Sequence, residues 1–352
     1  MTHPDDLEIL PPELLTFYCP FKAEVRAEAD TLFQGSLAWA QQFGLDSDGH
    51  AAMMAMAGAG YTAHAIPHAK GEVAQALADY NTWAWTVNDY VTSGDQLGTI
   101  ITSLGRWERI IRSPRSWPDA TRPLDAAAAD VFQRLRCLLT PVQWERFSAG
   151  QSHWIQSMGW EAAHLETDRP VSVNDYLAMR IGYVGVYSAA AFLDAVEDIE
   201  LSEQQWARPT VRAAAESSML AAALDNDRYS YPRERRHPIR KPNLFDAIRH
   251  ERPQLTVAQA LLEGVTIRDR ILTLYVRLRE DILRDADDGL HSYITGLDRI
   301  VSGNVNMATA ASRYLLADFP HKIITTAHPA DVSTAPLRIP TIAWWWEHDT
   351  ST

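Results

Sequence analysis

Three oxygen-bearing side chains recur at intervals of four residues in the run NDRYSYPRE, residues 226–234. They are Asn226, Ser230 and Glu234. An α-helix turns once every 3.6 residues, so this spacing predicts a helix with all three side chains on nearly one face. Amide, hydroxyl and carboxylate oxygens suit Mg²⁺ better than zinc or copper. The alternative is a solvated helix start, because Asn, Asp and Ser also favour caps and turns.

The charge of this set indicates what a metal bound there would hold. One carboxylate among three ligands leaves Mg²⁺ with net positive charge, which suits a polyanion such as diphosphate. Arg233 lies beside Glu234 and can add a charge-assisted contact to a phosphate group. Pro232 argues against an undisturbed helix, because proline removes a backbone hydrogen bond and kinks the chain.

Helical patterns run through nearly the whole chain, whereas strand signals are almost absent. Apolar residues recur at helical spacing, and neither an Asn-Gly hairpin turn nor sustained alternation occurs. The sequence predicts one large all-α domain over residues 21–320, between an N-terminal arm (1–20) and a C-terminal tail (321–352). The expected helices span 23–43, 48–64, 71–92, 96–112, 124–137, 141–165, 173–196, 203–231, 256–285 and 289–317.

Charge and composition exclude several classes of partner. The formal net charge is −13 and no basic run of five residues occurs, so nucleic acid and anionic membranes are poor partners. Cys19 and Cys137 lie too far apart in sequence to suggest a disulfide framework or a zinc site. Neither a secretory start nor a membrane-spanning apolar run is visible, so a cytoplasmic location is expected. Twelve Trp and twelve Tyr supply the rings that usually line apolar pockets.

Two pairs of residues are further candidates for the same site. Asn88 and Asp89 end the helix expected at 71–92, where an acidic group can hold metal from the opposite side of a cavity. A plain helix terminus is the alternative. Arg313 and Tyr314 stand near the end of the last expected helix, where both can donate to one phosphate group. The alternative for this pair is an ordinary amphipathic helix end.

Arg180 is the last candidate. It lies on a stretch that is otherwise almost uncharged from Leu177 to Leu193, so the guanidinium needs either a partner or access to water. A buried diphosphate would satisfy its planar fork bidentately. A structural ion pair with Asp194 or Glu197 is the alternative.

Taken together, these groups resemble the bacterial class I terpene synthases. Asn226, Ser230 and Glu234 match the family's second metal motif, NDxxSxxxE, in full. Arg180 lies 46 positions before Asn226, where the family places its diphosphate-sensing arginine. Arg313 lies 87 positions after Asn226, where the family carries a terminal Arg-Tyr pair. The resemblance extends from about residue 20 to residue 320.

The sequence departs from the family pattern at two places. The first metal motif of the family is rich in aspartate, whereas the matching stretch here, Asn88 to Thr92, contains Asp89 alone. Asp89 is therefore expected to coordinate metal by itself or in a shifted register. Met307 stands where relatives often place a tryptophan facing the carbocation. A thioether is polarizable but lacks the ring quadrupole that stabilises cations.

The resemblance implies an α-helical bundle around a central apolar cavity, and a cyclase acting on a linear C15 or C20 isoprenyl diphosphate. With Mg²⁺, expected as three ions, the enzyme would ionise the substrate and cyclise the carbocation to a terpene hydrocarbon or alcohol. A prenyltransferase and a non-catalytic diphosphate-binding or scaffold protein remain alternatives, and a homodimer is left open. The implied metal ligands are Asn88, Asp89, Asn226, Ser230 and Glu234. The implied catalytic and substrate-binding residues are Arg180, Tyr183, Val184, Arg233, Arg313, Tyr314, Trp83, Trp85 and Met307.

Overall fold

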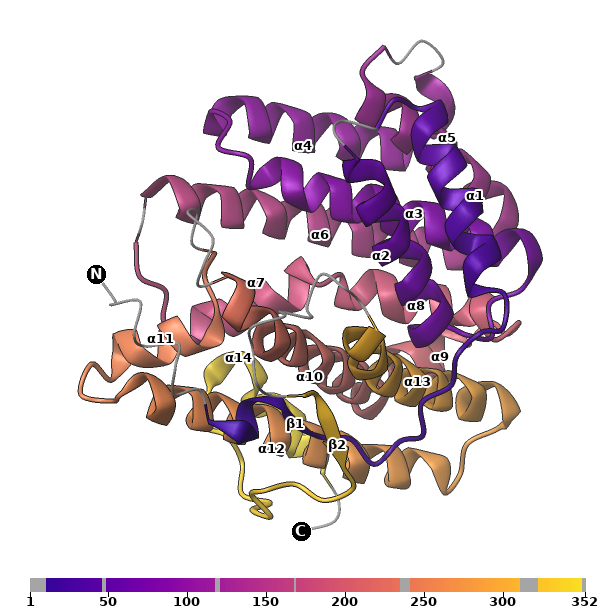
Figure 1. Cartoon of the computed structure of the whole chain (residues 1–352). Coiled ribbons are helices and arrows are strands. Elements are labelled where there is room, and N and C mark those ends of the chain that lie inside the picture. The colour runs from indigo at the N-terminus through magenta and orange to yellow at the C-terminus, as the bar shows by residue number, and fades with distance from the viewer. Residues whose placement is uncertain are drawn as a thin grey trace.

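The computed structural model describes residues 11–45, 49–117, 121–167, 169–234, 241–310 and 322–349. Helices dominate this part of the chain (Figure 1), which confirms the all-α prediction. The α-helices are α1 (Ala29–Gln42), α2 (His50–Ala65), α3 (Gly71–Val91), α4 (Leu97–Arg112), α5 (Pro123–Leu138), α6 (Pro141–Thr167), α7 (Val173–Tyr183), α8 (Val186–Val196), α9 (Glu203–Ala207), α10 (Pro209–Glu234), α11 (Leu244–Glu251), α12 (Val257–Leu283), α13 (Asp288–Ala310) and α14 (Pro340–Ala343). Short 3₁₀ helices and strands complete it: η2 (Pro12–Leu15), β1 (Thr16–Tyr18), η3 (Pro114–Ser116), β2 (Ile324–Thr326) and η4 (Trp344–His348).

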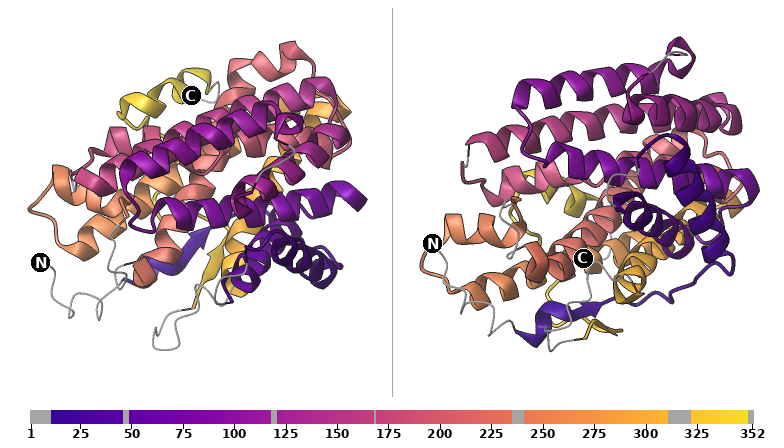
Figure 2. Two further views of the ribbon diagram at one scale, coloured as in Figure 1. Left: turned by 90° about the horizontal axis from the view of Figure 1, so that it is seen from above. Right: turned by 45° about the horizontal axis from the view of Figure 1, so that its top comes forward.

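Helix α10 lies in the middle of the bundle. It packs against α12 and α13 and also contacts α7 and α8, while α6 and α4 lie on the far side of α7 and α8 (Figures 1 and 2). Its first half is rich in alanine, and nearly all residues from Val211 to Pro232 are buried. A helix that is buried on every side must have small or apolar side chains all round. The alanines let its neighbours approach closely, and this packing presents the end of α10 to the interior.

Two glycines set close approaches around the same interior. A Cβ at Gly303 of α13 would overlap the backbone of His64 at the end of α2. A Cβ at Gly150 of α6 would lie 2.5 Å from the Ser188 backbone nitrogen of α8. Only glycine allows backbones to approach so closely. These contacts fix how α13 and α8 lie against the neighbouring helices.

The stretch expected as one helix over 173–196 is two helices, so that prediction is corrected. Helix α7 ends at Tyr183, and Gly185 has a φ of +68°, in the left-handed region that glycine adopts readily. By length and composition, Val173–Val196 is the one described stretch that would be able to cross a membrane, and 78% of that window is buried in the bundle. Such burial is also what a core helix of a globular bundle shows.

Other boundaries differ from the expected ones for local reasons. The helix expected over 203–231 is split before Pro209, because the residue preceding a proline is pushed out of the helical region. Helix α10 then continues through Pro232 to Glu234, three residues beyond the expected end. The helix expected from residue 23 begins at Ala29, because the Arg26 backbone N–H donates to the Ala63 carbonyl and the segment crosses the end of α2.

The first and the last described segments of the chain pack on the bundle. Strands β1 and β2 pair in parallel, with Thr16 opposite Ile324, and three-residue strands are too short to leave a period in the sequence. The tail places the Trp345 indole in the interior, where its Nε1–H donates to Glu216 of α10 at 2.9 Å. The tryptophan-rich segment therefore covers this chain's own central helix.

Candidate active site

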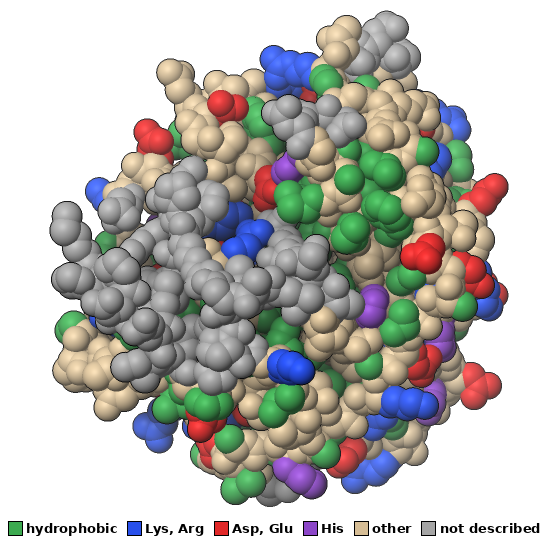
Figure 3. Space-filling model, in the orientation of Figure 1, with side chains coloured by type: hydrophobic (Ala, Val, Ile, Leu, Met, Phe, Trp, Pro, Cys, Tyr) green, Lys and Arg blue, Asp and Glu red, His purple; other side chains and the backbone are tan. Residues whose placement is uncertain are grey.

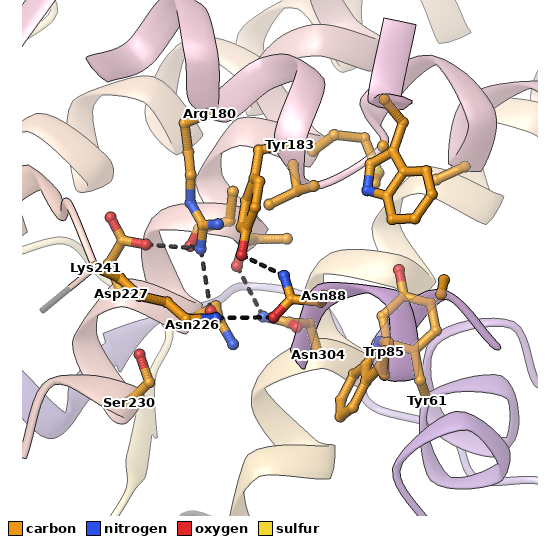
Figure 4. Close-up of a pocket in the computed structure, with 18 of the residues that line it drawn as sticks. Tyr61, Trp85, Asn88, Arg180, Tyr183, Asn226, Asp227, Ser230, Lys241 and Asn304 are labelled. Carbon is orange, nitrogen blue, oxygen red and sulfur yellow. Dashed lines mark hydrogen bonds and ion pairs between the residues drawn. The ribbon is translucent and has the colours of Figure 1, made fainter. Parts of the chain in front are cut away.

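A cavity lies between α3, α6, α7, α8 and α10, with polar side chains at one end and aromatic ones at the other (Figure 4). The polar end is lined by Asn88, Asp89, Glu161, Arg180, Asn226, Asp227, Ser230, Arg233, Glu234 and Lys241. The remaining wall includes Tyr61, Tyr80, Ala84, Trp85, Trp154, Tyr183, Val184, Ala189, Phe192, Met219, Ala222 and Ala223. Lys and Arg side chains are seen near the centre of the face in Figure 3, where acidic and basic groups are otherwise interspersed.

The helix spacing brings Asn226, Ser230 and Glu234 to the same cavity. The Ser230 hydroxyl oxygen is buried and has no hydrogen-bond partner within the described residues. Among the described residues, no group of three His, Cys, Asp or Glu side chains could hold a metal ion. The set on α10 contains one carboxylate beside an amide and a hydroxyl. An orphaned oxygen beside a carboxylate fits a hard cation such as Mg²⁺.

Arg180 reaches this set from α7. Its Nη2 forms an ion pair with Asp227 Oδ1 at 2.7 Å, and it donates to Asn226 Oδ1 and to the Ala223 carbonyl, each at 3.0 Å. Tyr176 donates its hydroxyl hydrogen to the other Asp227 oxygen. Burial raises the pKa of Asp227 to about 6, although the Arg180 charge acts in the opposite direction.

The two alternative partners considered for Arg180 are engaged elsewhere. Asp194 pairs with Arg146 at 3.0 Å, and Glu197 pairs with Arg299 at 2.7 Å. The partner of Arg180 is thus a residue of the motif itself. This contact joins α7 to the metal-motif end of α10.

The first motif divides its two residues between different tasks. Asp89 lines the cavity, and its Oδ2 lies 3.6 Å from His50 Nε2. Asn88 is engaged at both ends of its amide: Nδ2 donates to the Tyr183 hydroxyl, and Oδ1 accepts from Lys241 Nζ at 2.9 Å. Of the pair, Asp89 alone supplies a carboxylate to the cavity.

Two residues expected on the cavity wall lie outside it. Trp83 is fully buried against Phe132 and Trp107, with its Nε1–H donating to a carbonyl 3.1 Å away. Side chains two positions apart on a helix point in nearly opposite directions, so Trp85 faces the cavity while Trp83 faces the core. Met307 is buried and lies 3.9 Å from the position of a Cβ at Gly60, between α13 and α2.

Arg313 and Tyr314 lie outside the described residues, so their predicted role stays a prediction. Tyr183 and Val184 line the cavity at the break between α7 and α8. The predicted wall residue Trp85, on α3, and the predicted phosphate contact Arg233, on α10, also line the cavity.

Sequence reasoning missed several polar residues of the cavity, among them Glu161, Lys241 and Asn304. Glu161 of α6 is 3% exposed, and burial raises its pKa, although nearby Lys241 and Tyr183 favour its ionised form. Lys241 follows the motif in the sequence, in a stretch whose pattern indicates only a charged loop. Asn304 accepts from the Tyr229 hydroxyl at 3.2 Å and donates to the Ala222 carbonyl at 2.9 Å. A glutamate on an otherwise buried helix face was the one available signal.

The sequence and the fold are similar to those of known proteins. Residues 79–269 match the family model described as terpene synthase family 2, C-terminal metal binding. The chain is similar to the diterpene cyclase DtcycB of a Streptomyces species, 44% identical over 96% of this chain and 98% of that protein. It is 30% identical to a germacradien-6-ol synthase of Streptomyces pratensis, over 95% of this chain and 97% of that protein. The crystal structure of the SVS_A2 protein from ancestral sequence reconstruction superimposes with a TM-score of 0.79 at 25% identity, covering 94% of this chain and 98% of that one.

Proposed function

The chain belongs to the terpene synthase family, and from this premise we propose that it is a Mg²⁺-dependent diterpene cyclase. The substrate would be a linear C20 isoprenyl diphosphate, cyclised to a terpene hydrocarbon or alcohol with release of diphosphate. One observation carries the proposal: the oxygen set of α10 and Arg180 occupy one end of a cavity whose other end is aromatic.

The C20 substrate is favoured over C15 by two observations. The relative that is 44% identical is a diterpene cyclase, whereas a T-muurolol synthase that cyclises farnesyl diphosphate is 28% identical. Alanines at 84, 189, 222 and 223 line the wall, and small side chains leave room for a longer hydrocarbon.

The polar end of the cavity supplies a cation site and hydrogen-bond donors. Asp89, Asn226, Ser230 and Glu234 would hold Mg²⁺, which when bound supplies Lewis-acid stabilisation of the leaving diphosphate. The Nε–H of Arg180 is buried and has no hydrogen-bond partner within the described residues, so it can donate to a phosphate oxygen. Arg233, Arg313 and Tyr314 are proposed as further donors, with three metal ions and a homodimer as finer parts of the same proposal.

The aromatic end of the cavity would exclude water and stabilise positive charge. Trp85, Phe192 and Trp154 present ring surfaces to the cavity, and ring faces attract cations. A cavity of this kind folds the hydrocarbon chain and delays capture of the carbocation by water. No nucleophilic side chain is needed, because departure of the diphosphate generates the electrophile.

A product assay tests this function. The purified chain is incubated with geranyl, farnesyl or geranylgeranyl diphosphate, with and without Mg²⁺, and extracts are separated by gas chromatography–mass spectrometry. We expect a cyclic product from geranylgeranyl diphosphate only when Mg²⁺ is present. A condensation product that needs a second isoprenyl substrate would indicate a prenyltransferase. No product from a folded chain would indicate a binding protein.

The Asp89→Ala variant tests the first motif. Asp89 supplies the only carboxylate of the Asn88-Asp89 pair, so its loss should lower turnover by at least about a hundredfold, as expected when metal-dependent stabilisation is removed. The measurement is the initial rate of diphosphate release at saturating substrate. Asp95→Ala is the matched control, because Asp95 is exposed beyond the end of α3 and should leave the rate unchanged. Near-wild-type turnover of Asp89→Ala would remove Asp89 from the proposed ligand set.

A further inference from the structure

A lysine that no metal motif predicts, Lys241, lies just before α11 and contacts the α3 side of the cavity. Lys241 Nζ donates to Asn88 Oδ1 at 2.9 Å, and Asn88 Nδ2 in turn donates to the Tyr183 hydroxyl (Figure 4). The two contacts use both ends of the Asn88 amide. Asn88 therefore holds the side chains of Lys241 and Tyr183 in place.

The charge of the ammonium is preserved by this arrangement. Asn88 is neutral, so it fixes the position of Lys241 without compensating its positive charge. An aspartate at position 88 would compensate that charge. Glu161 is one of the acidic residues that share this end of the cavity with Lys241, and its Oε2 is buried and has no hydrogen-bond partner among the residues described. Burial opposes the ionised form of Glu161, which limits how much charge it offers to Lys241.

Lys241 also lies where an anion is expected. It lines the same cavity as Arg180 and Ser230, so an anion between α7 and α10 has the ammonium within the same polar end. On the α3 side the sequence offers Asp89 as the single aspartate of the first motif. A fixed positive charge can act there directly on a phosphate group.

We propose that Lys241 binds the diphosphate group of the substrate directly, and that Asn88 is a positioning residue for Lys241, without a role as metal ligand. This inference rests on the proposed function. Lys241 supplies on the α3 side a positive charge that does not depend on bound metal, and Tyr183 braces Asn88 from the break between α7 and α8.

Binding of inorganic diphosphate to the full-length chain in the presence of Mg²⁺, measured by isothermal titration calorimetry, tests the role of the lysine. Lys241→Gln should weaken diphosphate binding by about tenfold to a hundredfold, the usual range for a lost charged hydrogen bond. Lys241→Arg should stay within about threefold of wild type, because it keeps the charge. Lys22→Gln, at an exposed site, is the control and should match wild type. Equal affinity of Lys241→Gln and wild type would overturn the proposal.

The Asn88→Asp variant separates the two roles of position 88. If Asn88 positions Lys241, a carboxylate there compensates the charge of the ammonium, so the affinity for diphosphate falls. The Mg²⁺ concentration for half-saturation is then the same as in the wild type. Tighter Mg²⁺ binding with unchanged diphosphate affinity would make position 88 a metal ligand and overturn the inference. A wild-type chain that binds no diphosphate with Mg²⁺ would refute the proposed function itself, whereas wild-type binding with no effect of Lys241→Gln refutes this inference alone.

Discussion

The Glu234→Gln variant is expected to lose about a thousandfold in kcat/KM at a Mg²⁺ concentration that saturates the wild type. Glu234 is the one carboxylate among the three oxygen-bearing residues of the α10 motif. Glutamine keeps the shape and one oxygen but removes the charge, so the metal site is weakened without creating a void. Loss of metal-assisted stabilisation worth about 4 kcal/mol corresponds to about a thousandfold in rate.

The Mg²⁺ dependence of the same variant makes the test specific. We expect the Mg²⁺ concentration for half-maximal rate to rise strongly in Glu234→Gln, so that added Mg²⁺ restores part of the activity. Glu280→Gln, which changes an exposed glutamate of α12, is the matched control and should keep both parameters. A Glu234→Gln enzyme with the Mg²⁺ dependence of the wild type would show that Glu234 is no ligand.

The part of the site that could be predicted from the sequence is the part fixed within one helix. Asn226, Ser230 and Glu234 reach one cavity because a spacing of four residues holds on any α-helix, whatever surrounds it. The same rule separates Trp85 from Trp83, although the sequence alone did not say which of them faces the cavity. Helical periodicity likewise predicted the all-α class.

The remainder depends on contacts between residues far apart in the chain. Lys241 meets Asn88 across 153 positions, and Arg180 meets Asn226 across 46, so no local pattern reports either contact. The break at Gly185 escaped prediction because the residues on both sides of it are largely apolar, and one backbone angle separates the two helices. Only the folded structure shows which distant side chains these residues contact.

Helix α10 also contacts distant residues on the side that faces away from the cavity. Asp225 is fully buried, and its Oδ2 accepts from Arg268 of α12 at 2.5 Å. Arg228, one turn along α10, lies 3.5 Å from Asp225 and donates to the Thr16 carbonyl at 2.7 Å. Arg268 also donates to the Tyr18 carbonyl. These contacts tie the first described residues of the chain to the helix that carries the metal motif.

Replacing Arg268 with Met is expected to lower the free energy of unfolding by about 3–5 kcal/mol, because Asp225 becomes a buried charge with a weakened partner. The measurement is denaturant unfolding followed by circular dichroism. Arg284→Met, at an exposed pair with Asp281, is the control and should change stability by less than about 1 kcal/mol. The double variant Arg268→Met/Asp225→Leu removes both charges and leaves Arg228 facing Asp269, so it should be more stable than Arg268→Met alone. If Arg268→Met unfolds at the wild-type denaturant concentration, the buried network does not hold α10 in place, and the orientation of the metal motif must rest on its alanine packing alone.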